Sequence, residues 1–180
     1  MKKTILSLSL IIAAVTVMGQ RSTTTSAVVT LDATTSKDAL PKAENKTVIG
    51  SLDKTTGALL FEAAVNNFSF SNPMMQTHFN SDKWMNSAVF PKFTFSGKIE
   101  KVNKVKFTQN GTYKVTVSGN LVIKGISKPI SIPATIVVKD GSIKTNASFS
   151  VKIKDYGISG QQVESGKVSD KPAITVSATF

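Results

Sequence analysis

Residues 111–141, GTYKVTVSGNLVIKGISKPISIPATIVVKDG, show a long alternating pattern that indicates the fold class. In its first half apolar side chains alternate with polar or charged ones, and the apolar positions are Tyr113, Val115, Val117, Leu121 and Ile123. A period of two is typical of a β-strand that buries one face. The pattern resumes from Ile130 to Val138, and the tight-turn pair Asp140-Gly141 follows. The stretch therefore predicts two antiparallel strands, each with one apolar face.

The same pattern continues on both sides of this stretch. It predicts further strands at residues 27–31, 47–52, 58–65, 93–99, 143–153 and 174–180. About eight antiparallel strands that each bury one face must close into a barrel or split into a sandwich. We therefore expect an all-β fold. Small residues at inward positions, among them Ala63, Ala134 and Ala147, favour an interior with room for a slim ligand.

Residues 72–91, NPMMQTHFNSDKWMNSAVFP, interrupt the strand pattern. Asn72 can cap a helix, and Pro73 suits the first helical position. Met74, Met75, His78 and Phe79 fall at helical spacing, and we expect them on one side of a short helix. A bulky apolar helix in an all-β chain can plug the core or cover the mouth of a cavity.

The beginning of the chain has the features of a secretory signal peptide over residues 1–20. Two lysines precede an apolar run that is too short to cross a bilayer, which needs roughly 20 residues. Cleavage is expected near Gly19 or Gln20. Residues 21–26 are Ser/Thr-rich and predict a flexible lead-in, residues 27–180 form one domain, and residues 36–46 predict a loop or a short helix. The protein is expected to be exported, and periplasmic and secreted locations both stay open.

The formal net charge is +11, and the lysines are scattered among β-forming residues. This distribution predicts a solvated outer surface that also discourages strand-edge pairing. The functional alternative is attraction to an anionic membrane. A nucleic-acid partner is not expected, because the chain lacks a basic motif interleaved with aromatic residues. The sequence is compatible with a homodimer.

The residue inventory argues against catalysis. The chain has one histidine, His78, and no cysteine, so neither a His/Cys zinc site nor a disulfide can form. Neither a phosphate-binding nor a dinucleotide-binding glycine motif is present. We expect no enzyme activity, no cofactor and no metal. The alternative that stays open is an enzyme that uses His78 with a nearby carboxylate.

Three stretches resemble the YceI-like family of exported, lipocalin-like polyisoprenoid-binding bacterial proteins. They are MMQTHFNSDKWMNSAVFPKFTFSGKI (74–99), the opening stretch (111–141) and ASFSVKIKDYGI (147–158). The second is similar to the family signature G-x-L-x-I-x-G-x-x-K-P-x-x-x-P, and the third to its D-[FY]-G-I ending. Residues 21–66 depart from the best-known members, since they lack the opening Trp.

The resemblance implies an eight-stranded, antiparallel lipocalin-like barrel whose pore holds a long isoprenoid chain, with the short helix near the pore mouth. The ligand would be a polyprenyl lipid or an isoprenoid quinone, bound without any bond being made or broken. Strand alternation and the resemblance together predict these ligand-binding residues: Phe68, Phe70, Met74, Met75, His78, Phe79, Trp84, Phe93, Phe95, Val115, Val117, Leu121, Ile132, Ala134, Ile136, Phe149 and Val151. The alternative is a structural or adhesive β-protein with a solid core, which binds anionic surfaces through a Lys-rich face.

Overall fold

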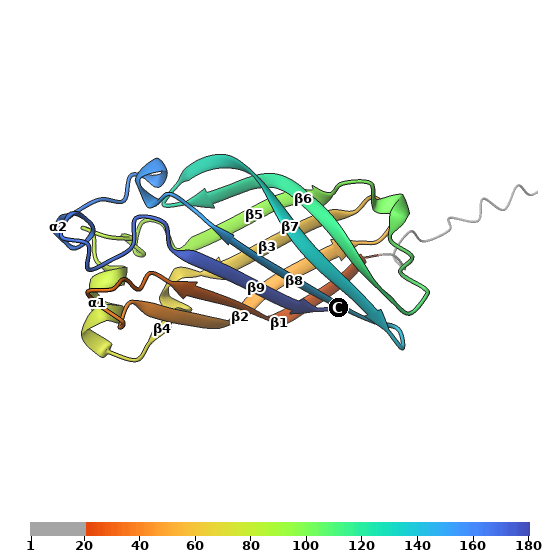
Figure 1. Cartoon of the computed structure of the whole chain (residues 1–180), viewed down its shortest axis with the longest axis horizontal. Helices are drawn as coiled ribbons and strands as arrows, with labels where there is room; N and C mark the ends of the chain where they lie inside the picture. The colour runs from red at the N-terminus through yellow and green to blue at the C-terminus, as the bar shows by residue number, and fades with distance from the viewer. Residues whose placement is uncertain (1–20) are drawn as a thin grey trace, which may run out of the picture.

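The computed structural model describes residues 21–180 (Figure 1). The predicted signal peptide at residues 1–20 lies outside this described part. The strands are β1 (Arg21–Asp32), β2 (Lys42–Asp53), β3 (Ala58–Ala64), β4 (Ser69–Phe70), β5 (Lys92–Ile99), β6 (Gly111–Ile123), β7 (Ile126–Lys139), β8 (Ser142–Ser150) and β9 (Ala173–Thr179). The helices are α1 (Pro73–Asn80) and α2 (Gln161–Glu164), with short 3-10 turns at Val65–Asn67, Val102–Lys104 and Ile153–Tyr156.

Eight strands close into an antiparallel barrel, as the sequence predicts. Their order is β1-β9-β8-β7-β6-β5-β3-β2, and pairing between β1 and β2 completes the circle. The two-residue β4 pairs only with the start of β2. Closure removes the free edges that an open sheet would expose.

Residues 21–26 are not a flexible lead-in. They form the first half of β1, where Arg21 pairs with Asp53 and Thr24 with Gly50. Thr24 is buried, and its neighbours Thr23 and Thr25 point to solvent. A threonine-rich segment shows little apolar alternation, but threonine suits strands, and β2 supplies the backbone partners.

Other predicted boundaries also need correction. Residues 42–46 are not loop or helix but the beginning of β2, and β7 begins at Ile126 rather than Ile130. β8 ends at Ser150, because a 3-10 turn at Ile153–Tyr156 follows instead of further strand. The polar connection over residues 157–171 contains the short helix α2.

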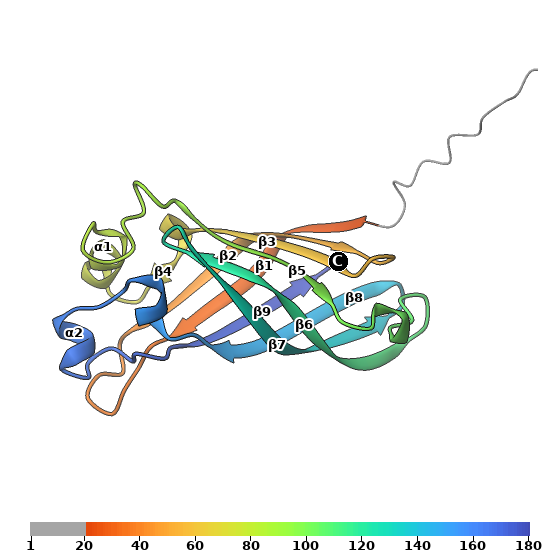
Figure 2. The same ribbon diagram turned by 90° about the horizontal axis from the view of Figure 1, so that it is seen from above.

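The two ends of the barrel differ. Residues 65–91 and 151–172, which carry α1 and α2, cover one end, called here the α1 end (Figures 1 and 2). Residues 100–110 connect β5 to β6 at the other end, called here the far end. Among residues 21–180, no helix has the length and apolar character needed to cross a membrane.

Helix α1 starts where the sequence predicts. The Asn72 side chain accepts a hydrogen bond from the Met74 backbone N–H at 2.9 Å, and Pro73 occupies the first helical position. This pairing satisfies one of the free amides at the helix start. The cap therefore fixes where the chain turns from β4 across the α1 end.

Candidate functional site

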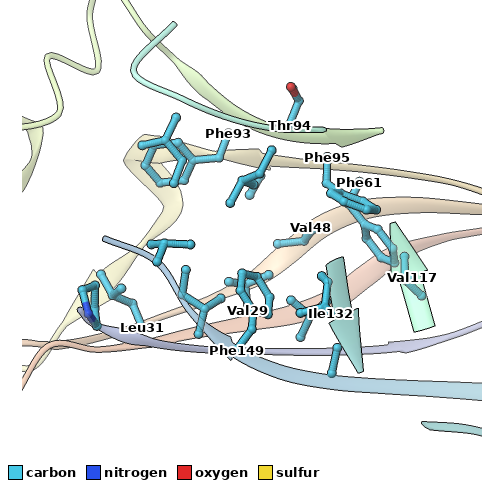
Figure 3. A pocket seen from close by; sticks show the side chains of 18 of the residues that line it. Val29, Leu31, Val48, Phe61, Phe93, Thr94, Phe95, Val117, Ile132 and Phe149 are labelled. Carbon is cyan, nitrogen blue, oxygen red and sulfur yellow. The ribbon is translucent and has the colours of Figure 1, made fainter. Parts of the chain in front are cut away.

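An apolar cavity runs through the barrel. Its volume is about 160 Å³. All eight barrel strands contribute to its wall, and so do both covering segments of the α1 end. Figure 3 shows side chains from several strands converging on this space, among them Val29, Ile132 and Phe149. The barrel is therefore hollow rather than filled.

Most of the predicted ligand-binding residues line the cavity. Phe79 reaches it from α1, and Phe68 from the turn before β4. The complete set of predicted residues in the wall is Phe68, Phe79, Phe93, Phe95, Val117, Leu121, Ile132, Ala134, Ile136, Phe149 and Val151. They come from β5, β6, β7, β8 and the two covering segments, so these are the parts where sequence alternation and structure agree.

Three predicted residues on α1 lie away from the cavity wall. Met74 is 68% exposed, His78 is exposed and Met75 is half-buried. Phe79 is 5% exposed and is the buried residue of the helix. The expectation that these four residues share one inward side is therefore wrong. Of these four residues, only Phe79 is buried and lines the cavity.

Three further predicted residues lie near the cavity but outside its wall. Phe70 and Trp84 are half-buried and pack against the core at the α1 end. Val115 packs against the core at the far end, although its cross-strand partner Ala134 lines the cavity. These side chains support the wall instead of forming it.

Sequence reasoning missed several wall residues. Ala63 and Ala147 line the cavity, as expected for inward positions, although they are not among the predicted ligand-binding residues. The missed residues on the strands are Val29, Leu31, Val48, Leu59, Phe61, Thr94, Ile99, Ile123, Thr145, Asn146, Ile174 and Val176. Alternation along the first and last strands carries a signal for many of them. Met85, Ile158 and Pro172 come from the covering segments and have no periodic signal, whereas Ile153 is the last residue of the alternating run at residues 143–153.

Aromatic rings close the α1 end of the cavity. The Phe79 ring centroid lies 5.0 Å from that of Phe70, 5.8 Å from that of Phe68 and 6.5 Å from that of Phe93. Tilted and edge-on contacts at these distances are favourable. Met85 is buried in the same apolar cluster, and its backbone N–H donates a hydrogen bond to the Phe79 carbonyl at 3.1 Å. These aromatic contacts attach α1 to the barrel.

The cavity wall contains no ionisable side chain. Three groups with shifted pKa values lie outside it, and one is Asp53, whose pKa is lowered mainly by a hydrogen bond from the Thr56 backbone N–H. The Thr34 hydroxyl donates to the Asp32 carboxylate at 2.6 Å and lowers the pKa of Asp32, with the Lys42 ammonium 3.2 Å away. Burial, with a smaller contribution from Asp155, raises the pKa of Tyr156.

His78 forms no ion pair with a carboxylate among residues 21–180. The ion pairs found within residues 21–180 are Lys42–Asp32, Lys46–Glu44 and Lys92–Glu62, and none involves this histidine. The same part of the chain contains no cluster of three or more His, Cys, Asp or Glu side chains that could hold a metal ion.

The apolar cavity inside the barrel suits a slender hydrocarbon. A polar ligand would lose its hydrogen bonds to water there without gaining others from the wall.

Comparisons with known proteins agree with this geometry. The family model for the YceI-like domain matches residues 12–180. A polyisoprenoid-binding domain from Saccharophagus degradans, implicated in plant cell wall breakdown, superposes with a TM-score of 0.75 at 12% identity, covering 89% of this chain and 97% of that chain. A search of curated proteins gave no significant match.

Two further structures share the fold. BcnA of Burkholderia cenocepacia has a TM-score of 0.70 and 17% identity, covering 86% of this chain and 96% of that chain. The YCEI protein of Campylobacter jejuni has a TM-score of 0.55 and 21% identity, covering 74% of this chain and 80% of that chain. Because the family model spans all of the described residues 21–180, this chain belongs to the YceI-like domain family.

Proposed function

We propose that this protein binds a long apolar isoprenoid lipid, a polyprenyl lipid or an isoprenoid quinone, inside the barrel. It carries or sequesters the lipid and makes or breaks no bond. The observation that carries the proposal is the cavity, which all eight strands line and in which no ionisable side chain lies. The polyisoprenoid-binding domain of Saccharophagus degradans, which shares the fold, supports the same ligand class.

The energetics favour a hydrocarbon ligand of this shape. Removing apolar surface from water contributes about 25 cal/mol per Å². An isoprenoid chain is apolar along its whole length, so a slender cavity can remove most of its surface from water. Its branched methyl groups meet small and β-branched wall residues such as Ala134, Ala147 and Val176. The hollow interior favours this function over a structural or adhesive protein with a solid core.

The proposed function includes export, because residues 1–20 have the pattern of a signal peptide. An exported protein could present its lipid to an anionic membrane, and the exposed lysines Lys98, Lys114 and Lys144 on the outer face are compatible with that contact. An insoluble lipid needs such a carrier to cross the aqueous space between membranes.

Native mass spectrometry followed by organic extraction tests the proposal. The exported form is purified without detergent from an exporting host, and a second sample is refolded with added polyprenyl phosphate or ubiquinone. We expect an added mass that is released as an isoprenoid lipid. If both samples carry no lipid while the protein is folded, the proposed function is wrong.

A further inference from the structure

The barrel interior contains two apolar clusters. The α1-end cluster includes Phe68, Phe79 and Leu121, and the far-end cluster includes Leu52 and Ile136. Among the described residues, three half-buried side chains pack against both clusters: Phe61, Phe95 and Phe180. These phenylalanines, called here the crossbar, therefore mark the boundary between the two halves of the interior.

The crossbar reaches across the barrel. Phe61 on β3 lies directly opposite Phe95 on β5 in the strand pairing. The Phe180 ring, which follows β9, meets the Phe61 ring edge-on at a centroid distance of 6.2 Å. Strands β9 and β3 are separated by β1 and β2 in the closed order, so this ring contact crosses the interior instead of following the wall.

Three glycines next to the Phe95 and Phe61 rings determine where these two rings lie. A Cβ atom at Gly97 would stand 2.5 Å from Phe95 Cζ, and one at Gly119 would stand 2.8 Å from it. A Cβ at Gly50 would stand 2.7 Å from Phe61 Cε1. Real Cβ atoms do not approach carbon so closely. The two rings therefore rest against bare backbone, in space that any other residue would occupy.

The cavity reaches the crossbar, and the Phe61 and Phe95 side chains form part of its wall. Figure 3 shows Phe61 and Phe95 next to Val117, at the end of the cavity away from Leu31. Past the rings the wall continues with Leu59, Ile99 and Ile136 of the far-end cluster. A chain that enters from the α1 end meets the rings before it can fill this last part.

We propose that the crossbar fixes the length of the apolar chain that the barrel holds, with Phe95 and Phe61 as the residues that determine length. This inference rests on the proposed function. A chain whose tail ends at the rings is fully enclosed. A longer chain must displace the rings or leave its other end in water, which forfeits the burial that holds it.

The test offers a ladder of polyprenols that differ by one isoprene unit to the wild type and to Phe95→Ala. Bound chains are extracted and their lengths compared by mass spectrometry. Phe107→Ala is the matched control, because Phe107 packs only against the far-end cluster and does not line the cavity. Circular dichroism checks that each variant is folded, and Phe95→Leu replaces Phe95→Ala if the latter fails to fold.

We expect the most abundant bound chain to become longer by at least one isoprene unit in Phe95→Ala or Phe95→Leu, and to stay unchanged in Phe107→Ala. If the wild type binds polyprenols and the Phe95 variants bind the same lengths, the crossbar does not set the length and the inference is wrong. If the wild type binds neither the polyprenols nor added ubiquinone, the proposed function itself is wrong and the inference falls with it.

Discussion

Gly97 and Gly119 face each other across β5 and β6 on the inner side of the barrel. A Cβ atom at Gly119 would lie 2.5 Å from the Gly97 Cα and 2.8 Å from the Phe95 ring. The two strands and the ring therefore leave no room for a side chain at this point. Because neither glycine has a side chain, the Phe95 ring can lie against the strand backbone and form part of the cavity wall.

Gly119→Ala is expected to destabilise the protein, because the added methyl group meets backbone atoms that can move only with the strands. Overpacking of this kind costs about 1–3 kcal/mol. Urea denaturation measures the change. Ser96→Ala, an exposed position on the neighbouring strand, is the control and should stay within about 0.5 kcal/mol of the wild type. Equal stability of the two variants would show that the glycine pair is not needed.

Phe79→Ala is expected to loosen the α1 end. The Phe79 ring contacts Phe68, Phe70 and Phe93, and removing a buried phenylalanine costs about 3–5 kcal/mol. His78→Ala in the same helix is the control, since His78 is exposed. It should leave stability and bound lipid unchanged. A loss of lipid in the His78 variant with the fold intact would contradict the placement of α1.

Trp84 connects the two segments that cover the α1 end. It packs against the α1-end cluster, and a Cβ atom at Gly160 would lie 4.0 Å from its Cζ3 atom. The barrel wall is a continuous hydrogen-bonded ladder, so a lipid must enter or leave through an end. Trp84→Ala should therefore speed the transfer of bound polyprenol to lipid vesicles.

Trp84→Phe is the matched control, because it keeps an aromatic side chain between the two segments. It should exchange lipid at a rate close to that of the wild type. If Trp84→Ala and the wild type release lipid equally fast, the covering segments do not limit exchange at this end.

Alternation predicted the strands whose two faces differ most, and β6 and β7 are the best examples. It missed residues 21–26 because Thr24 is the buried residue there and exposed Ser and Thr residues surround it, so the face that packs inward carries no apolar signal. Pairing with β2, which is distant in sequence, makes this segment a strand.

The residues of the candidate site likewise fall into those that alternation predicts and those that it does not. The inward faces of β5 to β8 follow from alternation, and with them Phe95, Val117 and Phe149. Helical spacing placed Met74, His78 and Phe79 together, but periodicity gives the spacing of a helix face and not its direction. How α1 lies on the barrel depends on the aromatic contacts of Phe79, which involve residues before and after the helix.

The most direct test of the account is whether filling the cavity removes the lipid. Ala147 on β8 lines the cavity and is the cross-strand partner of Ala134 on the adjacent strand β7. The next residue, Ser148, is exposed on the outer face of β8. Ala147→Phe and Ser148→Phe therefore add the same ring to opposite sides of one strand. Native mass spectrometry then measures the bound polyprenol in each folded variant. We predict that Ala147→Phe loses the lipid and that Ser148→Phe keeps it at the wild-type level. Equal lipid in both variants would show that the ligand does not occupy the barrel, and would contradict the central claim.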